Sequence, residues 1–510
     1  MEGPVRMQAD LTSEIVIIGA GPSGICMGIK LKEAGFGDFV ILEKASDVGG
    51  TWRDSTYPGL TVDIPVLTYS FSFEQKPDWS SLWAPQRELY SYLRHCAEKY
   101  QLQAHLRFDR EVVDARYDEE KTLWVIRTGD GSEYRSRYMV NASGFLSVPK
   151  WPDFDGLEEF QGKKVHTSAW TDDLDLDGDR IAFVGTGATG IQLAPELAPI
   201  AGQLHVFQRT PIWLLPKPPM PVPAVLQRVF RLVPGVQRVA RLLTAAFMDL
   251  VFWRAFTNYG QVRLLAAAVE KLARGHIRTQ VEDPGVAERL TPRYSWGCKR
   301  PSFSNKFYPI FNRENVELVT EPIERLTPKG IVTRDGTERP IDALICATGY
   351  QPFEKAALPT YPVAGRGGQQ LAEYWDAHRY QAFRGFAVHG FPNYFMVFGP
   401  YSIASTSYIA MIELQVRNII RVLRAARSDG ADYVEVRKDA QAADFEATLR
   451  KKKTAIWTVA NCGSSNSFYY DRFGDTPGFR PTYHYREWWA ARTLSASHFH
   501  LEKRAGRVRA

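Results

Sequence analysis

Residues 15–24 decide the fold, and they read Ile-Val-Ile-Ile-Gly-Ala-Gly-Pro-Ser-Gly. The four β-branched residues are typical of a buried parallel strand. Gly19, Gly21 and Gly24 then have G-x-G-x-x-G spacing, and an apolar helical pattern runs from Gly24 to Ala34. Such glycines allow a tight turn, close approach of the backbone to a pyrophosphate, and close packing of the helix on the strand. The stretch therefore predicts a dinucleotide-binding unit with the phosphates at the helix N-terminus.

A carboxylate lies at the position where a dinucleotide-binding unit contacts the ribose of its ligand. The second strand, residues 39–42, is followed directly by Glu43, which lies 24 positions after Gly19. A carboxylate there can accept hydrogen bonds from ribose hydroxyl groups. We expect Glu43 to bind a nucleotide with free ribose hydroxyls, and a surface glutamate without a ligand is the alternative.

A second unit of the same design begins at residue 180. A strand over residues 180–184 leads into Gly-Thr-Gly-Ala-Thr-Gly at 185–190, and a helix and another strand follow. The position 24 residues after Gly185 is Arg209 rather than a carboxylate. A guanidinium binds a 2′-phosphate through two hydrogen bonds, whereas a carboxylate repels it. The second unit therefore predicts an NADP site, with an arginine in an ordinary ion pair as the alternative.

Two dinucleotide sites in one chain are typical of a flavoprotein that NADPH reduces, because a simple dehydrogenase needs only one. The fold class that we predict is α/β, with two Rossmann-like dinucleotide-binding domains (FAD and NADPH) and an inserted helical subdomain. The expected segments are 1–150 (FAD domain, first part), 151–217 (NADP domain, first part), 218–292 (helical insert), 293–384 (NADP domain, second part) and 385–510 (FAD domain, second part, and C-terminal tail).

The insert is predicted because the chain after residue 218 is first Pro-rich and then has apolar residues at helical spacing. Arg228, Arg231, Arg238 and Arg241 lie among these apolar residues. We expect the insert to pack over the substrate entrance, and association with a membrane surface is the alternative. A membrane-spanning segment is not expected, since the sequence has no run of about 18 uncharged apolar residues.

The composition is that of an ordinary globular protein. The 510 residues are 45% hydrophobic, 13% aromatic and 24% charged, which excludes a disordered, collagen-like or coiled-coil chain. The net charge of +6 is too small for this length to indicate a nucleic-acid partner. We expect loosely ordered ends over residues 1–12 and 491–510.

The five cysteines are widely spaced and odd in number, and no Cys-x-x-Cys occurs. This pattern predicts neither a disulfide framework nor a metal site. It favours a reducing compartment, and we expect a cytoplasmic protein.

Residues 160–170 fit the fingerprint F-x-G-x-x-x-H-x-x-x-W, just before the second glycine motif. On this stretch the chain resembles the Baeyer–Villiger monooxygenases of the class B flavin-containing monooxygenase superfamily, and the resemblance extends over residues 14–425. The related N- and S-oxygenating enzymes usually lack the tryptophan, so Trp170 favours the Baeyer–Villiger branch. Thr171 departs from the Pro or Asp that usually follows. Within the fingerprint, we expect His166 to act as a structural or gating residue and Trp170 to lie in packed core.

The resemblance implies an NADPH- and O2-dependent conversion of a ketone to an ester or lactone through a C4a-peroxyflavin formed on FAD. It also implies that Arg300, in the Gly-Cys-Lys-Arg-Pro segment 297–301, is catalytic. Its permanent charge would keep the peroxyflavin an anion and stabilise the oxyanion of the adduct. Asp63 would hold Arg300, and Lys299 would bind the 2′-phosphate together with Arg209.

The predicted site residues come from the two glycine motifs, from Glu43 and from the segments that the resemblance matches. The catalytic residues are Arg300 and Asp63. The cofactor-binding residues are Gly19, Gly21, Gly24, Glu43, Gly50, Thr51, Trp52, Val62, Asp63, Tyr69, Val112, Gly185, Thr186, Gly187, Thr189, Gly190, Gln192, Arg209, Thr210, Lys299 and Arg300.

Three other functions are open at this point. The first is oxygenation of nitrogen or sulfur, and the second is an NADPH-dependent flavin reductase. The third is a nucleotide-sensing protein without activity, against which the presence of both Arg300 and Asp63 argues. The expected partners are molecular oxygen and a small ketone, and the sequence predicts neither the identity of the ketone nor the oligomeric state.

Overall fold

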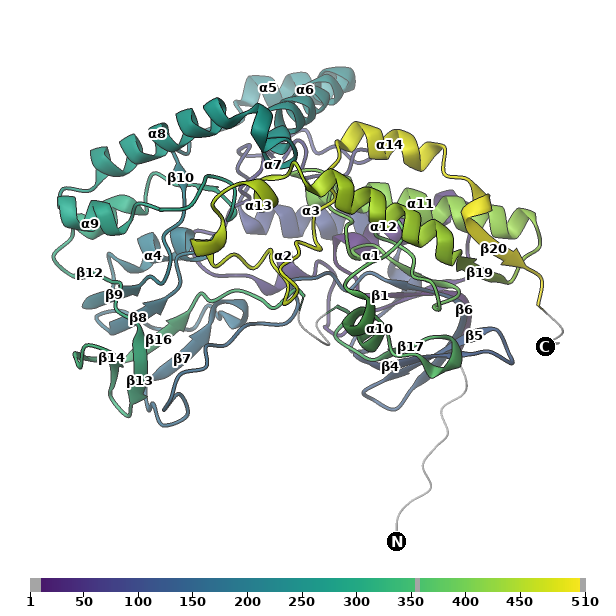
Figure 1. Ribbon diagram of the computed structural model, residues 1–510, viewed down its shortest axis with the longest axis horizontal. Helices are drawn as coiled ribbons and strands as arrows, with labels where there is room; N and C mark the ends of the chain where they lie inside the picture. Colours follow the sequence, from purple (N-terminus) through teal and green to yellow (C-terminus); the bar gives the residue numbers. More distant parts are fainter. Residues whose placement is uncertain (1–10, 354–357, 505–510) are drawn as a thin grey trace, which may run out of the picture.

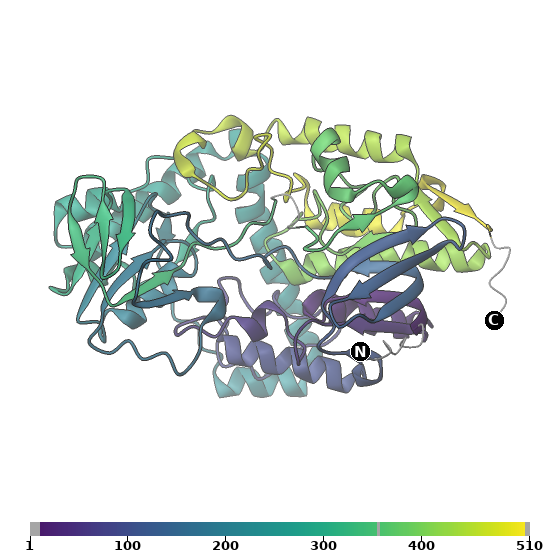
Figure 2. The same ribbon diagram turned by 90° about the horizontal axis from the view of Figure 1, so that it is seen from below.

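The computed structural model describes residues 11–353 and 358–504. Two α/β lobes lie side by side, with helices along the upper edge of the molecule (Figure 1). The same two lobes are seen from below in Figure 2, where long connecting segments run between them. The architecture is the predicted pair of dinucleotide-binding domains with an inserted helical region.

The first lobe is built on an eight-stranded mixed sheet. β1 pairs in parallel with β2 and β6, and the register places Ile15 beside Phe39 and Tyr138. β5 is antiparallel to both β4 and β6, whereas β17 pairs in parallel with β4 and β18 pairs in parallel with β6. The strand order is β17 (Val363–Ala364), β4 (Val112–Asp118), β5 (Leu123–Thr128), β6 (Glu133–Asn141), β1 (Leu11–Ile18), β2 (Phe39–Leu42) and β3 (Leu106–Arg107), with β18 (Tyr394–Met396) beside β6.

Helices pack on the parallel part of this sheet, where β2 and the end of β1 are buried on both faces. α1 (Pro22–Glu33) starts directly at the glycine turn and packs against α11 (Tyr408–Ser428). The other helices of the lobe are α2 (Thr51–Asp54), α3 (Gln86–Lys99), α10 (Leu371–His378), α12 (Lys438–Lys452), α13 (Ile456–Val459) and α14 (His484–Arg492).

The second lobe has a five-stranded sheet in which all strands are parallel. The strand order is β12 (Val316–Val319), β9 (Gln203–Phe207), β8 (Arg180–Val184), β16 (Ala343–Cys346) and β7 (Lys163–His166). α4 (Gly190–Leu197) follows the second glycine turn. A small antiparallel sheet flanks this lobe and consists of β13 (Ile323–Thr327), β14 (Gly330–Thr333) and β15 (Glu338–Pro340).

The helical insert leaves and rejoins the second lobe at one place. β10 (Leu214–Leu215) and β11 (Ser302–Phe303) pair in parallel and bracket it. Within the described ranges, no helix combines the length and the apolar character needed to cross a membrane. The helices of the insert are α5 (Ala224–Leu232), α6 (Pro234–Phe247), the π-helical segment η3 (Met248–Trp253), α7 (Arg254–Thr257), α8 (Arg263–Gln280) and α9 (Pro284–Arg289).

The chain returns to the first lobe earlier than the expected residue 385. β17 pairs with β4, and Leu371 and Trp375 of α10 lie in the core beneath the first sheet. Residues 363–384 therefore belong to the first lobe and not to the second part of the NADP domain. Strand β17 has two residues, too few to show a pattern in the sequence.

The expectation of loose chain ends is wrong for the part that the structure describes. Strand β1 begins at Leu11, so residues 11 and 12 belong to the sheet, whereas residues 1–10 lie outside the described residues. At the other end, β20 (Phe499–Glu502) pairs with β19 (Tyr433–Val436), and residues 505–510 lie outside the description. The partner strand of β20 is more than 60 residues away, and such a contact leaves no local signal.

Candidate active site

The first glycine turn has no room for side chains. Gly19 has a φ of +101°, and a Cβ there would lie 2.8 Å from the carbonyl oxygen of Ala142. A Cβ on Gly24 would lie 1.9 Å from the carbonyl oxygen of Gly19. Gly21 and Gly50 face each other, since a Cβ on Gly50 would lie 3.0 Å from the Cα of Gly21. Two bare backbone segments thus meet at the start of α1, as a cradle for a pyrophosphate requires.

Glu43 lies buried at the carboxyl end of β2. One oxygen accepts a hydrogen bond from the Ala20 amide (2.7 Å), and the other accepts one from the Ala45 amide (3.0 Å). Val112 begins β4 close by, because the Arg110 amide bonds the carbonyl oxygen of Glu43 (2.9 Å). A carboxylate has about four acceptor positions. Glu43 is therefore fixed by the glycine turn and can still accept hydrogen bonds from a ribose.

The second glycine turn repeats this geometry. Gly185 has a φ of +110°, and a Cβ there would lie 2.5 Å from the carbonyl oxygen of Ala347. A Cβ on Gly190 would lie 2.2 Å from the carbonyl oxygen of Gly185, whereas one on Gly187 would meet nothing within 4 Å. Thr186 is buried between these glycines, and Thr189 is the residue directly before α4. Gly187 is thus the position where the turn is open to a ligand.

Lys299 and Arg209 form a pair of neighbouring cations. The pKa of Lys299 is lowered to about 8 by burial and by the positive charge of Arg209. Among residues 11–353 and 358–504, no carboxylate lies within ion-pair distance of either side chain. Thr210 is held beside them, since its hydroxyl accepts a hydrogen bond from Asn466 (2.8 Å). Two adjacent cations without an acidic partner fit a dianion such as a 2′-phosphate.

Arg300 and Asp63 form an ion pair with two hydrogen bonds. Nε of Arg300 lies 3.0 Å from Oδ2 of Asp63, and a terminal nitrogen lies 2.7 Å from Oδ1. Burial alone would lower the pKa of Arg300, but the carboxylate of Asp63 outweighs burial and raises it. The guanidinium is therefore a fixed positive charge in this site.

Aromatic side chains surround this ion pair. The guanidinium of Arg300 lies 5.9 Å from the ring centroid of Tyr408, the first residue of α11. Burial raises the pKa of the Tyr69 and Tyr469 hydroxyls, both of which interact electrostatically with Arg300. Trp52 contacts Tyr69 edge-on at 5.6 Å between ring centroids. Arg300 thus lies at the edge of an apolar, aromatic region.

Gln192 joins the two lobes beside Asp63. It extends from α4 and accepts a hydrogen bond from the Thr61 amide (3.0 Å), while its amide nitrogen donates to the Thr61 carbonyl (3.3 Å). Tyr57 of the same loop lies 3.4 Å from the hydroxyl of Thr189. Through these contacts the second glycine motif is tied to the loop that contains Asp63.

Lys217 is a residue of this site that the sequence did not indicate. Its ammonium donates to the Thr61 hydroxyl (2.7 Å), and burial lowers its pKa, while the charge of Asp63 raises it. Lys217 lies between two prolines in the chain. Nothing in that spacing relates it to Asp63, which is more than 150 residues earlier.

The fingerprint residues lie where the second sheet meets the first lobe. His166 ends β7, is buried, and its Nδ1 lies 2.7 Å from the hydroxyl of Ser168. Trp170 packs in the core of the second lobe, and its carbonyl oxygen accepts a hydrogen bond from Thr56 (2.9 Å). Burial lowers the pKa of His166, so the imidazole is neutral at neutral pH.

The chain is similar to known proteins along most of its length. Residues 16–228 match the family described as pyridine nucleotide-disulphide oxidoreductase. A protein of Pseudomonas aeruginosa named Baeyer-Villiger monooxygenase is 38% identical over 454 residues, which cover 88% of this chain and 84% of that protein. The chain belongs to the Baeyer–Villiger monooxygenase family.

Other relatives agree with this assignment to the Baeyer–Villiger monooxygenases. A Streptomyces coelicolor protein of the same name is 34% identical, covering 90% of this chain and 87% of that protein. The closed crystal structure of a cyclohexanone monooxygenase superposes with a TM-score of 0.87 at 27% identity, covering 97% of this chain and 100% of that one. The structure of an oxidized steroid monooxygenase bound to NADP superposes with a TM-score of 0.82 at 28% identity, covering 96% of this chain and 100% of that one.

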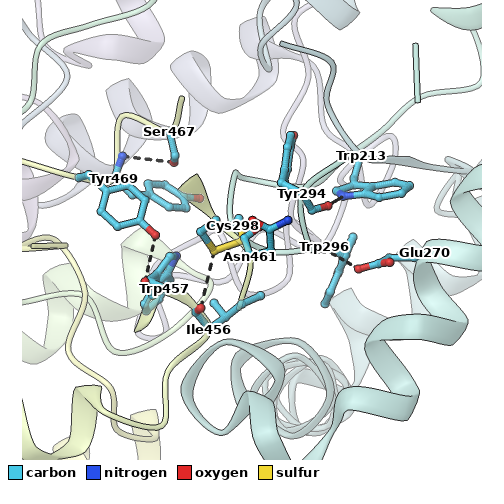
Figure 3. The surroundings of a disulfide bond; sticks show 12 residues. Trp213, Glu270, Tyr294, Trp296, Cys298, Ile456, Trp457, Asn461, Ser467 and Tyr469 are labelled. Atoms are coloured by element: carbon cyan, nitrogen blue, oxygen red, sulfur yellow. Dashed lines mark hydrogen bonds between the residues drawn. A yellow bond between two sulfur atoms is a disulfide. The ribbon is translucent and has the colours of Figure 1, made fainter. Parts of the chain in front are cut away.

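This member of the Baeyer–Villiger family contains a disulfide bond, which the cysteine spacing did not predict. Cys298 and Cys462 are bonded, with their Cα atoms 5.1 Å apart and a separation of 164 positions in the sequence. The bond joins the loop of Lys299 and Arg300 to the C-terminal segment that contains Tyr469 (Figure 3). Cys26, Cys96 and Cys346 are buried free thiols. The sequence predicted no disulfide framework, and it did not reveal this single bond because only the tertiary fold brings the two cysteines together.

Proposed function

We propose that the protein is an FAD-containing, NADPH- and O2-dependent monooxygenase that converts a ketone to an ester or lactone. The observation on which this proposal mainly rests is the Arg300–Asp63 ion pair, which lies where the two nucleotide-binding lobes meet. Related proteins are named Baeyer-Villiger monooxygenase or FAD-binding monooxygenase, and similar structures contain FAD and NADP. Bound FAD supplies the transfer of electrons from NADPH and the activation of oxygen.

The two glycine turns bind and orient the cofactors in this proposal. The cradle of Gly21 and Gly50 holds the pyrophosphate of FAD, and Glu43 accepts hydrogen bonds from its ribose. Gly187 lies against the pyrophosphate of NADPH, and Lys299 and Arg209 bind its 2′-phosphate. The Gln192 contacts with Thr61 keep the two cofactor sites in register.

Arg300 acts on the ketone. A guanidinium cannot give up its proton at physiological pH, so it presents a constant charge to the oxygen on which negative charge develops. Asp63 positions that guanidinium through two hydrogen bonds. Tyr69, Tyr408 and Tyr469 make the surroundings apolar, which favours a hydrophobic ketone.

A panel of substrates tests the function. Purified protein loaded with FAD is given NADPH and either linear ketones, cyclic ketones or thioethers, and product is compared with NADPH consumed. Ester or lactone in equal amount to NADPH supports the proposal. Sulfoxide as the main product would favour the heteroatom-oxygenating alternative, and hydrogen peroxide alone would favour a reductase.

We propose a cytoplasmic enzyme, since NADPH is its reductant. The buried Cys298–Cys462 bond is then an exception to the general rarity of disulfides in that compartment. Fractionation of the source cells, with the protein detected by antibody, tests this location.

A further inference from the structure

The helical insert exposes more apolar surface than any other part of the described chain. Fourteen of the 23 exposed large apolar side chains lie between Val225 and Leu272. Leu264 is 89% exposed, Val225 76% and Leu232 72%. Scattered single apolar residues are normal on a protein surface, but a continuous group marks an interaction site.

Helix α6 buries polar side chains and exposes apolar ones, which is the reverse of an ordinary surface helix. Gln237 and Arg241 point into the protein, where they donate to the carbonyl oxygens of Lys76 (2.7 Å), Leu67 (2.6 Å) and Ser70 (2.7 Å). Its apolar residues face outward at helical spacing. These exposed residues are Val236, Val239, Leu242, Leu243 and Phe247. The hydrogen bonds of Gln237 and Arg241 fix this orientation, so the apolar side of α6 is held outward by the fold.

Exposed apolar side chains also occur on other helices along the same edge of the molecule. In Figure 1, α8, α5, α6 and α14 lie along the upper edge of the molecule. α8 exposes Leu264 and Leu272, and α14 exposes Tyr485 and Trp489. Tyr and Trp are enriched at the boundary between water and lipid. We call the outward side of α5, α6, α8 and α14 the upper face.

Positive charge is concentrated in the same segment. Residues 224–280 contain nine Arg and Lys but two acidic residues, a net charge of +7, whereas the whole chain has +6. Arg228, Arg238 and Lys271 are exposed. The two acidic residues have partners: Glu270 accepts a hydrogen bond from the Trp296 amide (2.9 Å), and Asp249 contacts the hydroxyl of Ser405 (3.5 Å).

We propose that the upper face binds the surface of a lipid bilayer that contains anionic headgroups. Exposed apolar side chains beside Arg and Lys are the pattern of helices that lie in the interface of a membrane. The negative surface potential of anionic lipid attracts such basic segments. The reversed polarity of α6 gives the apolar residues of this face their outward direction.

Charge selects this occupant over a second copy of the chain. Two copies meeting through this face would bring two segments of charge +7 together. Like charges across an interface oppose association. An anionic bilayer instead complements the charge and accepts the apolar side chains.

Flotation of the FAD-loaded full chain with lipid vesicles tests the proposal. Vesicles of phosphatidylcholine with phosphatidylglycerol should carry the protein upward, and vesicles of phosphatidylcholine alone should carry much less. Raising the salt concentration should weaken binding, because screening shortens the range of the attraction. Failure to float with the anionic vesicles at low salt would overturn the proposal.

Two matched pairs of variants locate the contact. Arg228→Glu with Arg238→Glu should weaken binding to the anionic vesicles by about tenfold or more. The control, Arg116→Glu with Arg334→Glu, makes the same charge change at exposed positions on strand β4 and beyond strand β14. Equal loss in both pairs would show attraction by overall charge only and would contradict the assignment of the upper face.

A second pair of double variants tests the contribution of the apolar side chains. Val239→Ser with Leu243→Ser should also weaken binding, whereas Val113→Ser with Ile200→Ser, exposed elsewhere, should not. All variants should keep their FAD content and thermal unfolding, since these side chains are exposed. Sedimentation velocity without lipid gives a further outcome: a dimer that Val239→Ser with Leu243→Ser dissociates would identify a second copy as the occupant and would overturn the proposal.

Discussion

Arg300 meets Asp63 through two hydrogen bonds, although 237 positions separate the two residues in the sequence. Arg300 comes from the loop before β11, at the exit of the helical insert, and Asp63 from a loop of the first lobe. Gln192 of the second lobe bonds to Thr61, two residues from Asp63. The pair therefore lies where all three parts of the chain meet, and each part is needed to form the site.

Replacing Arg300 should abolish oxygenation while leaving cofactor binding largely intact. We expect Arg300→Ala to lower kcat for ester formation by about 100- to 1,000-fold, the usual effect of removing one fixed donor to a developing oxyanion. Ester formation and flavin content are measured together. Arg293→Ala, at an exposed arginine seven residues earlier, is the control. Wild-type kcat in Arg300→Ala would remove this residue from the reaction.

The protein should use NADPH less efficiently at alkaline pH. The pKa of Lys299 lies at about 8, lowered by burial and by Arg209, so the ammonium loses its proton as pH rises through 8. A neutral Lys299 attracts a 2′-phosphate less, and kcat/KM for NADPH should therefore fall above that pH. The free-enzyme pKa is read from the profile of kcat/KM.

Two comparisons isolate the role of Lys299. Lys299→Arg keeps the charge at all accessible pH values and should flatten the profile. NADH has no 2′-phosphate, so its kcat/KM should lack this dependence. A fall that is the same for NADH and NADPH would mean that another group titrates.

Gly187 and Gly190, two of the three glycines of the second turn, should respond differently to alanine. A Cβ on Gly190 would lie 2.2 Å from the carbonyl oxygen of Gly185, so Gly190→Ala should distort the turn and lower the free energy of unfolding. A Cβ on Gly187 would meet nothing within 4 Å. Gly187→Ala should therefore leave stability unchanged and raise only the KM for NADPH. Equal losses of stability would contradict the proposed open position at Gly187.

The disulfide should be detectable by counting thiols. Without reductant, the unfolded protein should expose three thiols, those of Cys26, Cys96 and Cys346, and reduction should add two. Cys298→Ala with Cys462→Ala should lower the free energy of unfolding by about 2–5 kcal/mol. Reduced wild-type protein is the control and should resemble the double variant. Five thiols before reduction would show that the bond is not formed.

The local parts of the fold could be predicted from the sequence because their causes are local. The turns that begin at Gly19 and Gly185 each require glycines at fixed positions within a segment of six residues. The helices α1 and α11 have helical patterns along their whole length. The contacts of Cys298 with Cys462, of Lys217 with Thr61, and of β20 with β19 could not be predicted. Each depends on segments that only the complete fold brings together, and no spacing within either segment records its partner.

The upper face shows another limit of prediction from the sequence. The sequence showed apolar residues and arginines at helical spacing in the insert, and packing over the substrate entrance was the preferred interpretation. Which side of α6 faces the protein depends on Gln237 and Arg241, whose partners are carbonyl oxygens of residues 67–76. An amphipathic pattern gives the two sides of a helix but not which side is buried.

The origin of the oxygen atom in the product shows whether the protein inserts oxygen from O2 into a ketone. The FAD-loaded protein is supplied with NADPH, a cyclic ketone and 18O2, and the product is analysed by mass spectrometry. We expect a lactone that contains one 18O atom, and loss of that product in Arg300→Ala. NADPH oxidation that yields labelled hydrogen peroxide and unchanged ketone would contradict it.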